Sequence, residues 1–336
     1  MKTKILDTVL LFALPASGKS EVRTYMDSKT FLSRLGGRSP VGPTLQLDDY
    51  PYVHFMHRID DELKKHGMAY VFYKGPDRPF ANPFEWGTLI ELLNEDYDDL
   101  LNNRVFTPGS ASQLMFDRLD RARAKVGLPE ALAMLPWKVR LAVGAALEEE
   151  TAAELARKNA TCAQDRKGRT IFIEAARGGA NGAAFPLTPP FGYGYAFERL
   201  SDAILDRAGV LYIWVTPEES RRKNRERGRP DGQGSILHHM VPMEVMLGDY
   251  GCDDMEYLIS TSGRKDSVKV ERIVVVKDRK GQPRYAEKTW HLPVARFDNR
   301  KDLTTFVRKP EREWKPAEAA RIHDELVRSL TILARA

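Results

Sequence analysis

The chain has 336 residues, of which 29% are charged, and a formal net charge of +5. This length is enough for one large domain or two ordinary ones. The apolar runs are too short to span a bilayer, so we expect a soluble protein without a membrane partner. The mild positive charge suits an anionic ligand and does not by itself indicate nucleic acid. The only cysteines, Cys162 and Cys252, lack metal-ligand spacing, which favours a reducing, cytoplasmic location.

Near the N-terminus, the apolar run Val9–Phe12 leads directly into the sequence Ala13-Leu14-Pro15-Ala16-Ser17-Gly18-Lys19-Ser20. This stretch follows the Walker A pattern G-x-x-x-x-G-K-[ST], with Ala13 in place of the first glycine. In that pattern a strand ends in a turn whose backbone N–H groups bind phosphate, and a helix then begins. The nucleotide-binding residues predicted from this stretch are Ala16, Ser17, Gly18, Lys19 and Ser20.

Two side chains of this turn have distinct expected roles. Lys19 is expected to reach the β- and γ-phosphates of a nucleotide, and the Ser20 hydroxyl is expected to bind Mg²⁺. Apolar residues from Val22 to Leu35 recur at helical spacing, so the sequence predicts that the helix continues to Gly36.

The segment 44–50 predicts a second short strand that ends in two carboxylates, Asp48 and Asp49, next to Tyr50. In open α/β sheets, ligands lie beyond the carboxyl ends of parallel strands, so both aspartates should lie at the edge that holds the turn. A carboxylate there can accept a proton from an attacking hydroxyl or bind Mg²⁺. The alternative is that the pair caps the following helix.

Residues 51–167 show one helical pattern after another, with apolar side chains spaced three and four residues apart. We expect this stretch to be a helical insertion that forms an acceptor-binding or cap subdomain. It would divide the core into a first part at 1–50 and a second part at 168–336.

The next predicted strand, residues 170–174, ends in Glu174, and Arg177 follows three residues later. Glu174 is placed to hold Mg²⁺ or a water bound to it, and Arg177 to contact an acceptor that carries an anionic or hydroxyl group. A surface ion pair between the two is the alternative.

Residues 210–215 predict another central strand, and Thr216-Pro217 is a typical helix start. The following segment, 217–236, is rich in arginine and then in glycine, and we interpret it as a lid. Guanidinium groups on a lid would offset the negative charge of a γ-phosphoryl group in transfer, whereas a solvated helix face is the alternative. The remaining chain predicts a β-hairpin around residues 278–282 and an amphipathic helix over 316–334.

The order of these features resembles that of the P-loop small-molecule kinases, in particular the uridine-kinase and deoxynucleoside-kinase branches. Asp48-Asp49-Tyr50 resembles their acidic-aromatic motif, whose carboxylate accepts the substrate hydroxyl proton. Glu174 and Arg177 loosely resemble their acid-and-arginine motif at a different spacing. The segment Leu47–Asp49, with His57-Arg58 after it, also looks somewhat like the kinase that phosphorylates seryl-tRNA.

The resemblance implies an α/β P-loop NTPase fold, a parallel sheet flanked by helices, with a large helical insertion and a C-terminal β-hairpin. It also implies transfer of the γ-phosphoryl group of ATP, with Mg²⁺, to a hydroxyl of a nucleoside- or sugar-like metabolite. The implied catalytic residues are Lys19, Asp48, Asp49, Arg225 and Arg227. Arg221 and Asn299 would bind the nucleotide; Asp49, Tyr50, Glu174 and Arg177 the acceptor; and Ser20, Asp48 and Glu174 the metal ion.

Asn299-Arg300-Lys301-Asp302 is similar to the guanine-reading N-K-x-D motif, but Arg300 replaces its lysine, so we expect ATP and leave GTP open. Two other functions stay open on the sequence alone. One is a kinase that acts on a nucleic-acid or tRNA-borne hydroxyl, and the other is a non-catalytic nucleotide-binding switch.

Overall fold

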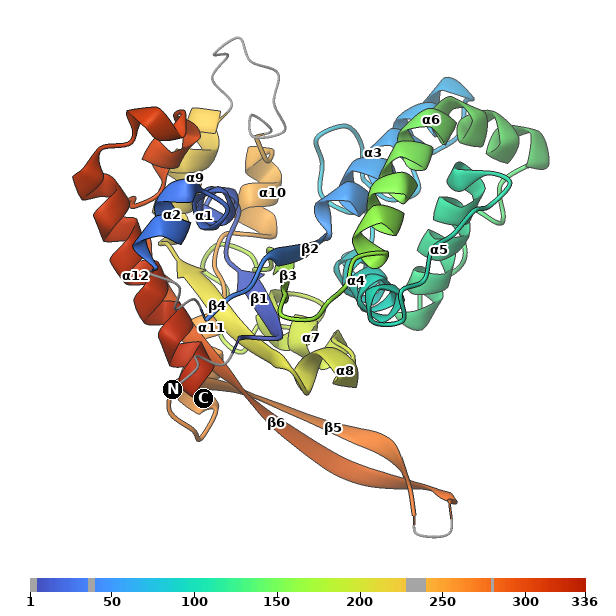
Figure 1. Ribbon diagram of the computed structural model, residues 1–336. Coiled ribbons are helices and arrows are strands. Elements are labelled where there is room, and N and C mark those ends of the chain that lie inside the picture. The colour runs from blue at the N-terminus through green and yellow to red at the C-terminus, as the bar shows by residue number, and fades with distance from the viewer. Residues whose placement is uncertain (1–4, 36–39, 228–239, 279–280) are drawn as a thin grey trace.

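In the computed structural model, which describes residues 5–35, 40–227, 240–278 and 281–336, six strands form one sheet in the order β2-β3-β1-β4-β6-β5 (Figure 1). The first five strands of this order run parallel, and β5 pairs antiparallel with β6. The strands are β1 (Thr8–Phe12), β2 (Thr44–Asp48), β3 (Thr170–Ala175), β4 (Ala208–Trp214), β5 (Ser267–Lys277) and β6 (Pro283–Asp298).

Helices cover both faces of this sheet, so the predicted α/β class with a mostly parallel sheet is confirmed. In the part of the chain that the structure describes, no helix is long and apolar enough to cross a membrane. The helices are α1 (Lys19–Met26), α2 (Lys29–Arg34), α3 (Tyr50–Lys65), α4 (Glu85–Leu101), α5 (Ala111–Lys125), α6 (Trp137–Cys162), α7 (Gly192–Arg199), α8 (Asp202–Leu205), α9 (Pro217–Arg227), α10 (Met243–Gly248), α11 (Met255–Thr261), α12 (Pro316–Arg335) and the short 3₁₀ helices η2 (Thr305–Arg308) and η3 (Glu311–Glu313).

The central strand β1 shows how the sequence produces this three-layer packing. All five of its residues are buried, as expected for a parallel strand covered on both faces. Val9 and Leu11 face a core shared with α1 and α12, whereas Leu10 and Phe12 face a core shared with α4 and α7. The carboxyl end of β1 is therefore held in the middle of the sheet, where the Ala13–Ser20 turn begins.

Helices α3 to α6 gather at one side of the sheet, between β2 and β3 in the sequence (Figure 1). Their apolar side chains form a second core, to which α4 contributes Trp86 and Leu89. The other face of α4 contributes Ile90, Leu93 and Tyr97 to the core of the sheet. Helix α4 thus joins the helical part of the chain to the sheet.

Two short stretches differ from the sequence prediction in the same way. In each of them the sequence predicts one helix, and the structure has two. The helix after the turn ends at Met26, and Ser28 starts α2 by accepting a hydrogen bond on its Oγ from the Phe31 backbone N–H at 3.1 Å. A local side-chain acceptor of this kind competes with continuation of the helix. The sequence also predicts a single helix from about Tyr195 to Arg207, and the structure has α7 and α8 there instead.

The strands β5 and β6 form the predicted hairpin, and its far half extends beyond the helices (Figure 1). Three large apolar side chains there, Ile273, Val275 and Tyr285, are exposed. The buried core residues of the hairpin, such as Val268 and Trp290, lie in its near half.

Candidate active site

The Ala13–Ser20 turn follows β1 directly, and α1 begins at Lys19, as the sequence predicts. Gly18 precedes the helix with a positive φ of 100°. A Cβ at this position would lie 2.4 Å from the Thr304 Oγ1 and 2.7 Å from the Asn299 Nδ2, so no side chain fits there. The turn is therefore pressed against the loop that follows β6.

Ala16 has a φ of 56°, which is a left-handed conformation that glycine adopts more easily. We expect Ala16→Gly to leave the free energy of unfolding unchanged or to raise it by up to about 1 kcal/mol. Glycine relieves the strain of the left-handed backbone, and this gain exceeds the cost of the extra conformational entropy that glycine gives the unfolded chain. The matched control is Ala145→Gly, which changes an exposed residue in the middle of α6. It should lower the free energy of unfolding by about 1 kcal/mol. Urea unfolding of both variants checks this, and equal losses would contradict the strained turn.

Lys19 lies over the turn, where its Nζ donates a hydrogen bond to the Ala13 carbonyl oxygen at 3.2 Å. Burial of the ammonium group lowers the pKa of Lys19, and the charges of Glu174, Asp49 and Asp48 partly offset that effect. The lysine of the turn is thus close enough to the carboxylates at the ends of β2 and β3 for their charges to interact.

Asp48 and Glu174 are direct neighbours, because β2 and β3 pair in parallel with these two residues in register. Arg23 of α1 lies between them, with its Nη1 2.6 Å from the Glu174 Oε2 and 3.8 Å from the Asp48 Oδ2. Burial, followed by the charges of Glu174 and Asp49, raises the pKa of the Asp48 carboxyl to about 7. A group with that pKa can exchange a proton near neutral pH.

We expect the raised pKa of Asp48 to appear as a pH dependence of stability. At intermediate pH the folded state keeps a proton that the unfolded chain, with an ordinary aspartate pKa of 3.8, releases. The stability from this group is therefore lost as the pH rises from about 4 to about 7. Asp48→Asn cannot titrate, so its Tm relative to the wild type should increase between about pH 4 and about pH 7 and stay level above that. A Tm difference that is constant with pH would contradict this assignment.

Asp49 has a different environment from Asp48. Its Oδ2 accepts a hydrogen bond from the Nη1 of Arg177 at 2.7 Å, and both residues are buried. The Arg177 guanidinium also lies over the Trp86 ring, 5.1 Å from its centroid. Two predicted acceptor residues are therefore paired with each other, and the pair fastens the end of β2 to α4. Tyr50 begins α3 beside them and is half-buried.

The predicted lid begins with α9, and residues 228–236 of it lie outside the described residues. Thr216 caps α9 as predicted, because its Oγ1 accepts the Glu219 N–H at 3.2 Å. The Ser220 hydroxyl donates to the Pro15 carbonyl oxygen at 2.7 Å, which fastens α9 to the turn.

The three predicted arginines of α9 have different surroundings. Arg225 is exposed, and Arg221 pairs with Glu218 at 2.9 Å on the same helix. Arg227 is the one that turns toward the site, where its Nη2 lies 3.6 Å from the Glu21 Oε1. The structure thus brings Arg227 near the turn and leaves Arg225 at the surface.

Asn299 follows β6 and is fully buried beneath the turn. Its Nδ2 donates to the Ser17 carbonyl oxygen at 2.6 Å and to the Thr304 Oγ1 at 2.9 Å, and its Oδ1 accepts the Leu303 N–H at 2.6 Å. Since the amide already bonds to the protein at both ends, Asn299 supports the turn in this structure. A contact with a nucleotide base would require these bonds to break.

Four residues near the site were not found from the sequence. Arg23 could have been found, because it follows Lys19 by four residues and so lies on the same face of α1. Lys223 is buried and pairs with Asp302 at 2.8 Å. Glu21 and Arg308 form an ion pair at 2.7 Å although 287 residues separate them, so no local pattern signals their contact.

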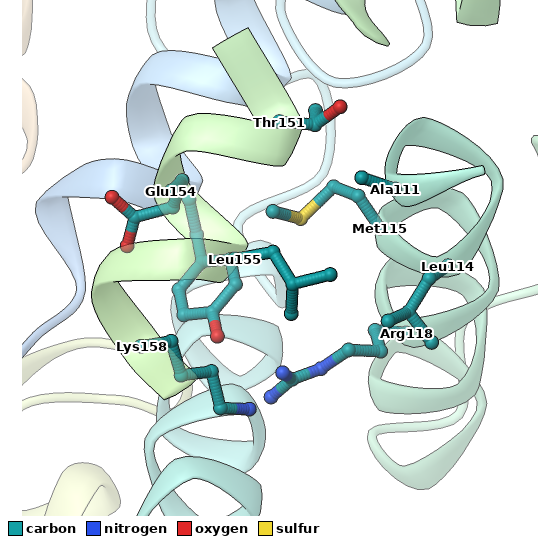
Figure 2. Close-up of a pocket in the computed structure, with 9 residues that line it drawn as sticks. Ala111, Leu114, Met115, Arg118, Thr151, Glu154, Leu155 and Lys158 are labelled. Atoms are coloured by element: carbon teal, nitrogen blue, oxygen red, sulfur yellow. The ribbon is translucent and has the colours of Figure 1, made fainter. Parts of the chain in front are cut away.

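A small cavity lies among α3, α5 and α6, with Arg118 and Lys158 pointing toward each other at one end (Figure 2). Both cations pair with Asp96 of α4 at 2.7 Å, and Tyr52 donates to the same carboxylate at 2.7 Å. The cavity holds about 20 Å³, the room that one water molecule needs. It is therefore part of a buried ionic network and is too small for an acceptor molecule.

In comparisons with known proteins, no family model matches the chain and no curated protein matches it.

Proposed function

We propose that the protein is a P-loop kinase that transfers the γ-phosphoryl group of ATP to a hydroxyl of a small metabolite. The observation that carries this proposal is the position of Lys19, which lies in the turn after β1 and within electrostatic reach of Asp48 and Glu174 at the carboxyl edge of a parallel sheet. A cationic turn can hold phosphate, and a carboxylate with a raised pKa can accept the proton of a hydroxyl; phosphoryl transfer to a hydroxyl uses both.

The residues have separate roles in this proposal. The backbone N–H groups of the turn and the Lys19 ammonium hold the β- and γ-phosphates. Asp48 accepts the proton of the acceptor hydroxyl, since Asp49 is committed to Arg177. Arg227, which approaches the turn from the end of α9, offsets negative charge on the transferred group.

The oxygen ligands near the turn fit Mg²⁺. Ser20, Asp48 and Glu174 offer a hydroxyl and two carboxylates, which are the donor types that Mg²⁺ prefers. In the described residues no group of three or more His, Cys, Asp or Glu side chains is arranged as a metal cage. Mg²⁺ commonly binds through one or two carboxylates plus substrate phosphates and water, and it would neutralise charge on the phosphates when bound.

The experiment that tests the proposal is ADP release from ATP and Mg²⁺ across a panel of nucleosides, sugars, amino-alcohols and RNA. Stimulation by one small-molecule class supports the proposal and names the acceptor class. Stimulation by RNA alone, with affinity that falls steeply with salt, would instead support a nucleic-acid kinase. Tight ATP binding without stimulated turnover would favour a nucleotide-binding switch.

A further inference from the structure

A cluster of one carboxylate and two guanidinium groups lies beside the turn. Glu21 is on α1, two residues after Lys19; Arg227 is the last residue of α9; and Arg308 ends η2. The Glu21 Oε1 accepts a hydrogen bond from the Arg308 Nε at 2.7 Å and lies 3.6 Å from the Arg227 Nη2. Three segments that are distant in the sequence therefore meet at a single carboxylate oxygen.

The Glu21 carboxylate is buried, with 3% of the residue exposed. Burial raises its pKa, but the charges of Arg227 and Arg308 and the hydrogen bond from Arg308 outweigh that effect, so the pKa of Glu21 is lowered. A buried carboxylate that stays ionised is held in place by its cationic partners. Glu21 thus fixes where both guanidinium groups lie.

The charges of the cluster do not cancel. One carboxylate faces two guanidinium groups, and Lys19 adds a third cation close enough to Arg227 for the two charges to interact. Burial lowers the pKa of Arg227, and its charge also interacts with that of Glu174 at the end of β3. With one carboxylate for two guanidinium groups, the cluster itself carries one excess positive charge.

The guanidinium groups also keep hydrogen-bonding capacity. Each has five N–H donors in a planar fork that matches phosphate oxygens. In the described residues, Glu21 takes one donor from Arg308, and the Nε of Arg227 is buried without a hydrogen-bond acceptor. Such groups beside a phosphate-binding turn suit a di- or triphosphate.

We propose that Glu21 positions Arg227 and Arg308 as a pair of guanidinium groups that bind the phosphates of the nucleotide. This inference rests on the proposed function and adds two residues to it. Arg308 becomes a nucleotide-binding residue, and Glu21 becomes a positioning residue that acts through both arginines.

The test is calorimetric titration of ATP with Mg²⁺ into the full chain and its variants, with a Tm for each variant. Arg308→Gln should weaken ATP binding about 10- to 100-fold, because it removes charge-assisted hydrogen bonds. Glu21→Gln should weaken it roughly 3- to 10-fold, and Glu21→Asp, which keeps the charge, should restore part of the loss. Glu21→Gln should have a smaller effect when Arg308 is already Gln, because positioning is then partly lost.

Arg312→Gln is the matched control, because Arg312 lies four residues after Arg308 with its side chain 85% exposed. It should bind ATP as the wild type does. A lower Tm for Glu21→Gln with unchanged ATP affinity would overturn the inference, since Glu21 would then be only structural. Unchanged affinity in Arg308→Gln would also overturn it while leaving the proposed function intact. A wild type that binds no nucleotide would overturn the proposed function and this inference together.

Discussion

Lys19→Ala is expected to lower ATP-dependent turnover by about 10²–10³-fold, the size of effect seen when one preorganised charge stabiliser is removed. The Lys19 ammonium lies over the turn, and its charge interacts favourably with those of Asp48, Asp49 and Glu174. Without it, a bound γ-phosphate would face three carboxylates with one cation fewer. ADP release with the stimulating acceptor is the measurement.

The control for Lys19→Ala is Lys29→Ala, which removes an exposed lysine at the start of α2. It should leave turnover within about twofold, since an exposed charge away from the turn contributes little. Full turnover in Lys19→Ala would show that the turn is not part of the active site, and the proposed function would lose its main support.

Asp48→Asn is expected to reduce phosphoryl transfer by about 10²–10⁴-fold while nucleotide affinity stays near that of the wild type. The change keeps the size of the side chain and removes its ability to accept a proton. Single-turnover transfer and ATP titration separate the two quantities. An unchanged transfer rate would assign the general base to Asp49 instead.

The variant to compare with Asp48→Asn is Asp49→Asn, which changes the adjacent aspartate. It removes one partner of the buried Asp49–Arg177 pair, so we expect a loss of stability of about 3–5 kcal/mol. Denaturant unfolding should therefore show Asp49→Asn as the less stable of the two variants. Equal stability of the two would contradict the division into a catalytic and a structural aspartate.

The pH profile provides a second check on Asp48. A general base must be ionised to accept a proton, and burial together with Glu174 and Asp49 raises the pKa of this carboxyl to about 7. The wild-type rate at limiting acceptor should therefore rise about tenfold per pH unit below neutrality and level off above about pH 7. Asp48→Asn should lack this rise.

The sequence was sufficient to predict the parts of the molecule that depend on local pattern. Continuous apolar runs such as Val9–Phe12 predicted buried central strands, and the rule about carboxyl ends predicted that Asp48 would lie at the sheet edge that holds Lys19. Both follow from the chemistry of a few consecutive residues and the geometry of a parallel sheet.

Other features depend on contacts between distant segments and could not be predicted in this way. Arg177 was expected to face an acceptor, but the tertiary packing of α4 places Trp86 against it and Asp49 beside it. Asn299 was expected to contact the nucleotide base, but the close approach of the turn to the loop after β6 engages its amide. The Glu21–Arg308 pair likewise exists only because η2 packs on α1.

The position of helix α4 has a consequence for how the molecule unfolds. It buries Ile90 and Leu93 in the core of the sheet and Trp86 and Leu89 in the helical core, so neither core is complete without it. The two cores should therefore melt together in one cooperative transition. An excised fragment of residues 51–167 would expose the sheet-facing side of α4 to water. A chimera that exchanges the helical part between proteins has to keep α4 with the sheet.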